Sequence, residues 1–128
     1  MPDKSAVADL LAASDVGMTI YKNLPVLHTC SPNKLFDTFA AGRAAIVNTP
    51  GWLQSLVEDN KIGFYVDPEN PNDLVERIEF LRDNPDIVKE MGRNARRLAT
   101  SNFDREKLAN QLIEVLERAS SEKIRTNN

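Results

Sequence analysis

The chain has 128 residues, a length that fits one domain. Its composition, 41% hydrophobic and 27% charged, is typical of a globular protein that buries a modest core. The formal net charge of −3 argues against a nucleic-acid binder held by phosphate contacts. Arg93, Arg96 and Arg97 are clustered on a predicted helix, and we expect them to form its solvated face.

The sequence argues against three other kinds of protein. Cys30 is the only cysteine, so no disulfide can form within the chain, and a reducing cytosol suits it. No run of about 18 apolar residues is present, and the N-terminus has no basic segment followed by an apolar one, so we do not expect membrane insertion. Acidic residues are scattered without a His/Cys cluster, and we therefore expect no metal site. No cofactor is expected either.

In the first half of the chain, helical and extended patterns alternate. Helices are predicted at residues 5–14, at 31–42 and from the Pro50-Gly51 turn to Val57, and a loop is predicted at residues 22–30. Continuous apolar runs predict buried strands at residues 16–21, 44–47 and 62–66. Strands that alternate with helices imply βαβ crossovers, so the predicted fold class is α/β with a three-stranded parallel sheet and flanking helices.

The second half of the chain is predicted to be helical. Asn70-Pro71, Asn84-Pro85 and Asp104 are expected to open three helices. The apolar residues of the last helix are expected to face inward: Leu108, Leu112, Ile113, Val115 and Leu116. The domain is expected to span residues 1–120, and residues 121–128 are expected to form a frayed polar tail.

Residues 31–42, SPNKLFDTFAAG, are the most informative stretch. Ser31 is predicted to be the N-cap of a helix with Pro32 at its first position, and Gly42 is predicted to stop it. The N–H groups of the first turn, the helix dipole and the ammonium of Lys34 would suit a phosphate. Most capped amphipathic helices bind nothing, however, so this feature taken alone favours an ordinary packing helix.

Four blocks of sequence in register carry a resemblance to a known family. They are LLAASDVGMTIY, SPNKLFDTFAAGRAAIVNT, LVEDNKIGFYVDPENPNDL and MGRNARRLATSNFD. Between about Ala6 and Leu116, the chain resembles the C-terminal, nucleotide-sugar-binding half of the GT-B glycosyltransferases. It is most similar to the retaining family-four group that builds bacterial polysaccharides and lipopolysaccharides. The resemblance implies a Rossmann-like partial GT-B C-terminal domain.

The resemblance also implies a donor site on the 31–42 helix. The implied donor-binding residues are Thr29, Ser31, Asn33, Lys34, Leu35 and Asp37. Asp37 matches the acid that holds the ribose hydroxyls, although the family usually carries Glu there. Thr29 stands where the commoner pattern has another Glu. No catalytic residue is implied, and GT-B enzymes generally need no metal because helix dipoles and basic side chains stabilise the departing diphosphate.

In this family, a basic pyrophosphate clamp and an acceptor-binding domain come earlier in the chain, and neither is recognisable here. We therefore expect the donor-binding portion of an enzyme that transfers a sugar from a nucleotide diphosphate sugar to a glycan or lipid-linked acceptor, and we expect it to be inactive alone. Whether the chain is itself an enzyme stays open. A cytoplasmic location is expected, with peripheral attachment at the inner membrane face left open.

Other interpretations differ in class. The chain could be a non-catalytic α/β interaction module, or a subunit that pairs with a missing transferase half. A flavodoxin-like regulatory domain is disfavoured, since no acidic pocket or phosphoacceptor pattern follows an early strand. The strand at residues 16–21 is expected to have an open edge that favours a homodimer or an exchange of segments. His28 could contact a donor sugar or relay a proton, but the favoured interpretation is a surface loop histidine. Trp52 could stack on a base or sugar or pack on the sheet.

Overall fold

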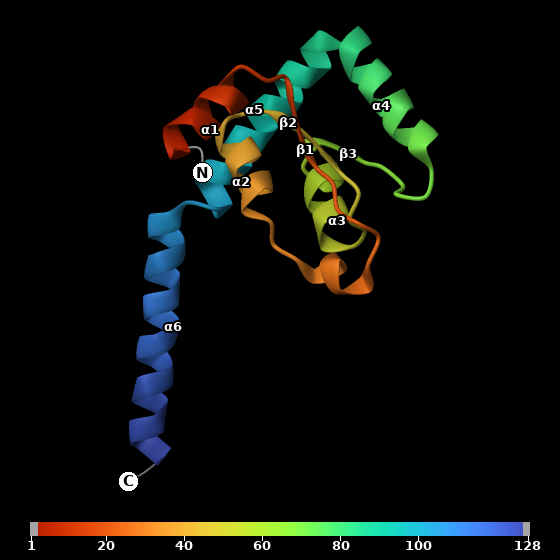
Figure 1. Ribbon diagram of the computed structural model, residues 1–128. Coiled ribbons are helices and arrows are strands. Elements are labelled where there is room, and N and C mark those ends of the chain that lie inside the picture. The colour runs from red at the N-terminus through yellow and green to blue at the C-terminus, as the bar shows by residue number, and fades with distance from the viewer. Residues whose placement is uncertain (1–2, 127–128) are drawn as a thin grey trace.

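A three-stranded parallel sheet organises the chain (Figure 1). The structure is a computed structural model, and it describes residues 3–126. Strands β1 (Val16–Thr19), β2 (Ala44–Val47) and β3 (Gly63–Tyr65) lie side by side in the order β1-β2-β3. The parallel register pairs Val16 with Ala44 and Ala45 with Gly63. The predicted α/β class with three parallel strands and flanking helices is confirmed.

Helices cover both faces of the sheet because successive residues of the central strand point to opposite sides. Ala45 and Val47 of β2 pack with residues of α2 (Asn33–Ala40) and α3 (Trp52–Asp59) on one face. Ala44 and Ile46 pack with residues of α4 (Pro71–Asp83) on the other face. The long helix α5 (Pro85–Asn102) contributes to both clusters. All four residues of β2 are buried, as the continuous apolar run predicts.

Helix α2 lies close to β1 because the strand has no side chain at one position. A Cβ atom added to Gly17 would lie 2.4 Å from two side-chain atoms of Thr38. The helix ends at Ala40, and Gly42 follows with φ at +67°, a conformation that glycine adopts without strain. The prediction that Gly42 stops this helix is confirmed.

The start of α2 differs from the prediction. Pro32, and not Ser31, is the N-cap residue, and no side chain caps the helix. Pro32 has an extended backbone, and its C=O accepts the first helical bond from the N–H of Leu35 at 3.0 Å. Pro32 is buried and Ser31 is exposed, so packing of the proline ring sets the boundary in place of a hydroxyl cap.

The segment between β1 and α2 also differs from the prediction. Residues Pro25–Thr29 form a 3-10 helix, η1, within the predicted loop. Strand β1 ends at Thr19, two residues before the predicted boundary. At Tyr21 the backbone N–H and C=O bond the side-chain amide of Asn48 and not the backbone of β2.

The two terminal helices are α1 (Lys4–Ala12) and α6 (Arg105–Thr126). Asp104 caps α6 as predicted, since its Oδ1 accepts from the N–H of Lys107 at 3.0 Å. The expectation that α6 turns its apolar residues inward is wrong: the helix projects away from the sheet (Figure 1), and Leu112 is 59% exposed. The apolar spacing predicted a stripe, but no other element of the described chain packs along it. The helix also continues past Ser120 to Thr126, and residues 127–128 lie outside the described residues.

Candidate functional site

The carboxyl ends of the three strands form the edge where a ligand site is expected, since open α/β sheets bind ligands outside these ends. The loops that follow the strands meet here, at residues 20–32, 48–51 and 66–70. Helices α2 and α3 both begin at this edge because each returns the chain to the start of the next parallel strand. The first-turn N–H groups of two helices are therefore directed toward the same edge.

Five of the six predicted donor-binding residues are exposed at or near this edge: Thr29, Ser31, Asn33, Lys34 and Asp37. Leu35 is the exception. Its side chain is fully buried in the core, and its N–H already donates to the C=O of Pro32. The first-turn donors without an intrahelical acceptor are therefore the N–H groups of Asn33 and Lys34.

The ammonium of Lys34 lies against an aromatic ring. Its Nζ is 4.4 Å from the centroid of the Tyr21 ring, within the range of a cation–π interaction. Burial raises the pKa of Tyr21 above its ordinary value, and the nearby Cys30 adds to the shift. The contact links the first turn of α2 to the loop after β1, which places a positive charge at the carboxyl edge.

Asn48 holds the loop after β1 in place, a role that the sequence did not reveal. Its Oδ1 accepts from the N–H of Tyr21 at 2.9 Å, and its Nδ2 donates to the C=O of Tyr21 at 2.8 Å. Asn48 follows the last residue of β2 and is 7% exposed. A polar residue directly after a fully buried strand is the signal that could have identified it.

Hydrogen bonds between polar side chains also join the loops after β1 and β3. Asn23 donates through Nδ2 to Oε1 of Glu69 at 2.8 Å, and its Oδ1 lies 3.2 Å from Nε2 of His28. Because β2 lies between β1 and β3, the loop that carries Asn23 must cross the carboxyl end of β2 to reach Glu69. Nothing in the spacing of these three residues predicted that they would meet.

A second glycine with positive φ precedes α3. Gly51 has φ at +85°, and nothing lies within 4 Å of the position a Cβ would take. Glycine is therefore favoured there by its backbone and not by close packing. Trp52 follows it and is 39% exposed, so its ring offers apolar surface beside the edge.

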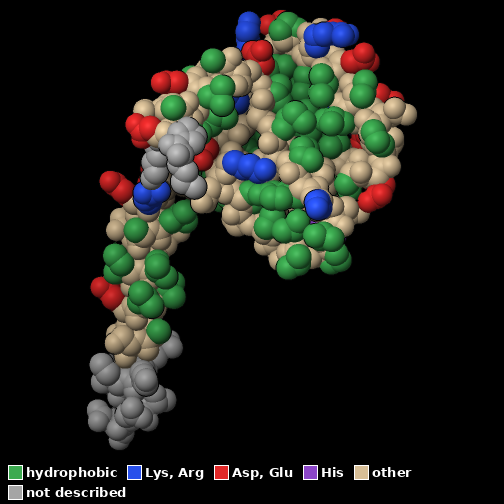
Figure 2. Space-filling model, viewed as in Figure 1, with side chains coloured by type: hydrophobic (Ala, Val, Ile, Leu, Met, Phe, Trp, Pro, Cys, Tyr) green, Lys and Arg blue, Asp and Glu red, His purple; other side chains and the backbone are tan. Residues whose placement is uncertain are grey.

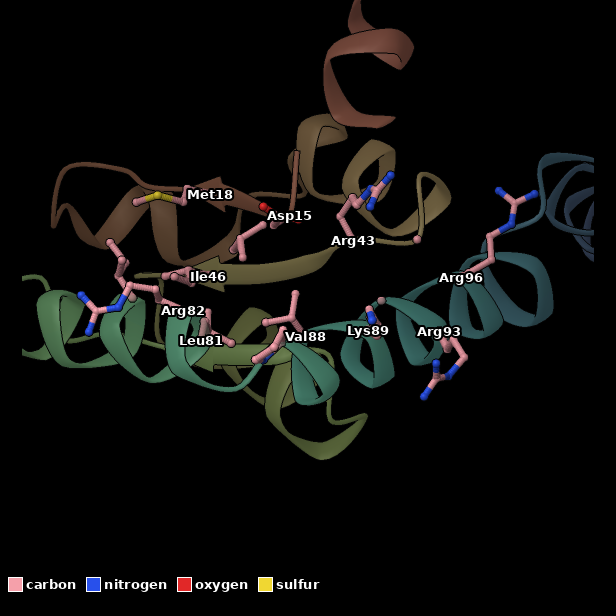
Figure 3. A pocket seen from close by; sticks show the side chains of 15 residues that line it. Asp15, Met18, Arg43, Ile46, Leu81, Arg82, Val88, Lys89, Arg93 and Arg96 are labelled. Atoms are coloured by element: carbon pink, nitrogen blue, oxygen red, sulfur yellow. The ribbon is translucent and has the colours of Figure 1, made fainter. Parts of the chain in front are cut away.

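A cavity of about 850 Å³ lies away from this edge, between β1 and helices α4 and α5 (Figure 3). Met18, Ile46, Leu81 and Val88 are among the residues that form its apolar wall, and hydrophobic side chains gather on this face in Figure 2. None of the six predicted donor-binding residues lines it.

The basic residues that line the cavity are Arg43, Arg82, Lys89, Arg93 and Arg96. Four of them have partners within the chain. Arg43 and Arg96 donate to the C=O groups of Ala12 and Ala40, and Arg82 and Lys89 pair with Asp83 and Asp86. The cavity is therefore an apolar hollow with a basic rim, and its chemistry differs from that of the carboxyl edge.

Two further features are absent from the described part of the chain. Among the residues whose side chains the structure describes, no group of three or more His, Cys, Asp or Glu could hold a metal ion. In the same part of the chain, no helix combines the length and apolar character needed to cross a membrane.

Comparisons with known proteins agree with the fold. A family model described as glycosyl transferase-like matches residues 2–114. The chain is 32% identical over 84 residues to spore coat protein SA of Bacillus subtilis (strain 168). The matched segment covers 65% of this chain and 22% of that protein, so the chain spans only a minor part of the curated relative. No solved structure matches the chain significantly.

Proposed function

Because the chain belongs to the glycosyl transferase-like family, we propose that its carboxyl edge binds the nucleotide diphosphate part of a donor sugar. The chain would be the donor-binding portion of a retaining GT-B enzyme of the family-four group, which builds polysaccharide or lipopolysaccharide. The acceptor would be a glycan or a lipid-linked sugar. These substrates imply a cytoplasmic location, with peripheral attachment at the inner membrane face where the acceptor is lipid-linked.

The observation that carries the proposal is the solvent-exposed side of α2. Asn33 and Asp37 lie four residues apart and therefore share one side of the helix. Leu35 and Phe39 anchor the opposite side, since both are fully buried. A diphosphate at the first turn would thus bring its ribose over Asp37, one turn further along the helix.

The chemistry of these groups suits a sugar nucleotide. A helix N-terminus stabilises an anion by about 0.3–1 kcal/mol at an exposed position, and the ammonium of Lys34 adds a positive charge. The carboxylate of Asp37 can accept hydrogen bonds from two ribose hydroxyls. The same N–H groups would stabilise the negative charge that develops on the departing diphosphate. Residues 29–37 account for the donor only, so we propose that transfer requires further groups and that this portion is inactive alone.

Isothermal titration calorimetry with UDP, GDP, ADP and CDP tests the proposal. Binding of at least one nucleotide is expected, and Asp37→Ala should weaken it at least tenfold, or about 1.4 kcal/mol. Asp59→Ala is the matched control because Asp59 is exposed and is the last residue of α3, at the end of that helix remote from the carboxyl edge. Silence with every nucleotide would contradict the proposal, as would an equal loss in both variants.

A second candidate function is an interaction module or subunit that pairs with another chain. The exposed edge of β1 favours it: β1 has a partner strand on one side only among residues 3–126. Met18 on this strand is 45% exposed beside the apolar cavity. Open strand edges with apolar side chains favour pairing with another chain, so we propose a homodimer through β1.

Light scattering at high protein concentration tests this second function. A dimer is expected for the natural chain, and Met18→Lys should convert it to a monomer because a charge at the edge opposes strand pairing. Val26→Lys introduces the same charge on the exposed η1 helix and should leave the dimer intact. A monodisperse monomer of the natural chain would contradict this function and leave the donor-site proposal standing.

A further inference from the structure

We propose that His28 is an additional ligand-contacting residue of the carboxyl edge and that Asn23 and Glu69 are positioning residues that set its tautomer. The inference rests on the proposed function, since the ligand is the sugar part of a nucleotide sugar. It concerns residues that lie outside the 31–42 helix and that the proposed donor contacts do not use.

The first step is the orientation of the Asn23 amide. A carboxylate only accepts hydrogen bonds, so Glu69, at 2.8 Å, must receive an N–H from Nδ2 of Asn23. The carbonyl Oδ1 of the same amide is thereby turned toward His28. The amide of Asn23 has one favourable orientation as long as Glu69 faces it.

The second step is the tautomer of His28. Oδ1 of Asn23 only accepts, and it lies 3.2 Å from Nε2 of His28, so Nε2 must carry the proton. In a neutral imidazole the other nitrogen, Nδ1, is then a hydrogen-bond acceptor. The chain Glu69–Asn23–His28 therefore converts a carboxylate on one loop into a defined acceptor on another.

The third step is the position of this acceptor. His28 belongs to η1, in the segment that joins β1 to α2. It lies three residues before Ser31. The imidazole is held through Asn23 by the loop after β3, so two loops of the carboxyl edge define its position. His28 as a whole residue is half-buried.

The chemistry of an acceptor selects the ligand group. Phosphate oxygens are themselves acceptors and gain nothing from Nδ1, whereas a sugar hydroxyl can donate to it. The inference is therefore that His28 recognises a hydroxyl of the donor sugar, while the first turn of α2 holds the diphosphate. The two groups divide the nucleotide sugar between them.

His28 is the only histidine of the chain, so its ring nitrogens give unambiguous NMR signals in untagged protein. Long-range ¹H–¹⁵N spectra at pH 8 should show Nε2 protonated. Glu69→Lys should reverse the Asn23 amide, because the new ammonium donates to Oδ1, and should shift the tautomer toward Nδ1–H. Glu76→Lys adds the same charge at an exposed position of α4 and should change nothing. An unchanged tautomer in Glu69→Lys would overturn the positioning role.

The ligand contact is tested with UDP-glucose and UDP, and with GDP-mannose and GDP. The sugar conjugate that binds should move the Nδ1 signal, and its nucleotide alone should not. His28→Ala should weaken that conjugate about two- to tenfold and leave affinity for the nucleotide unchanged. If no sugar conjugate moves the Nδ1 signal, the His28 contact is overturned. Calorimetric heat of binding in the same samples would then show that the proposed donor site still stands. No heat of binding would show that the donor-site proposal is wrong as well.

Discussion

The side-chain amide of Asn48 bonds both backbone polar groups of Tyr21, at 2.9 Å and 2.8 Å. It continues the pairing of β1 with β2 for one more step after the strands themselves have ended. The Tyr21 ring then lies under the ammonium of Lys34. The position of the charge at the proposed donor site therefore depends on a residue that would not itself contact the donor.

Asn48→Ala should lower the free energy of unfolding by about 1–3 kcal/mol, because it leaves two partly buried backbone groups of Tyr21 without partners. Urea denaturation followed by circular dichroism measures the change. Asn60→Ala is the matched control, since Asn60 is exposed and bonds only the C=O of Leu56. Equal stability of the two variants would show that the Asn48 bonds contribute nothing measurable.

Gly17→Ala should destabilise the chain by about 1–3 kcal/mol because the new methyl group meets the Thr38 side chain at 2.4 Å. The cause is steric, so Thr38→Ala in the same chain should restore part of the loss. A double-mutant cycle from denaturation curves should give a coupling energy of about 0.5–3 kcal/mol. Strict additivity of the two changes would contradict the close packing of α2 on β1.

The centre of the sheet could be predicted from sequence because strand β2 is fully buried. Residues 44–47 are apolar without interruption, as a strand covered on both faces requires, and the structure places β2 there. The start of α2 could not be predicted, since Ser31 and Pro32 both suit a helix beginning and only packing decides between them. The prediction that the apolar residues of α6 face inward was wrong for a related reason. Periodicity defines an apolar stripe but not the surface that covers it.

The candidate site was predictable only where it is local in sequence. Asn33, Lys34 and Asp37 belong to one helix, and helical spacing alone places Asn33 and Asp37 on the same side. Asn48 and Tyr21 are 27 residues apart, and Asn23 and Glu69 are 46 apart. Such pairs depend on the strand order, which a single sequence does not specify.

The two tyrosines of the chain should titrate above the ordinary pKa of about 10. Burial raises the pKa of both, and Tyr65 also faces the carboxylates of Asp67, Asp73 and Glu58. A raised folded-state pKa contributes stability that is present below about pH 10 and is lost as pH rises through the folded value. Alkaline titration of phenolate absorbance should therefore give higher midpoints in buffer than in concentrated urea. Coincident midpoints would contradict the burial of these rings.

Truncation of two leucines on different helices should change the free energy of unfolding by very different amounts. Leu35→Ala should cost about 2–5 kcal/mol, because its side chain is fully buried between α2 and the sheet. Leu112→Ala should change the free energy of unfolding by less than about 0.5 kcal/mol, because α6 projects into solvent. Urea denaturation at low and at high protein concentration measures both. A large loss in Leu112→Ala that grows with concentration would mean that a second chain covers α6, whereas a loss independent of concentration would mean that α6 packs on its own sheet in solution.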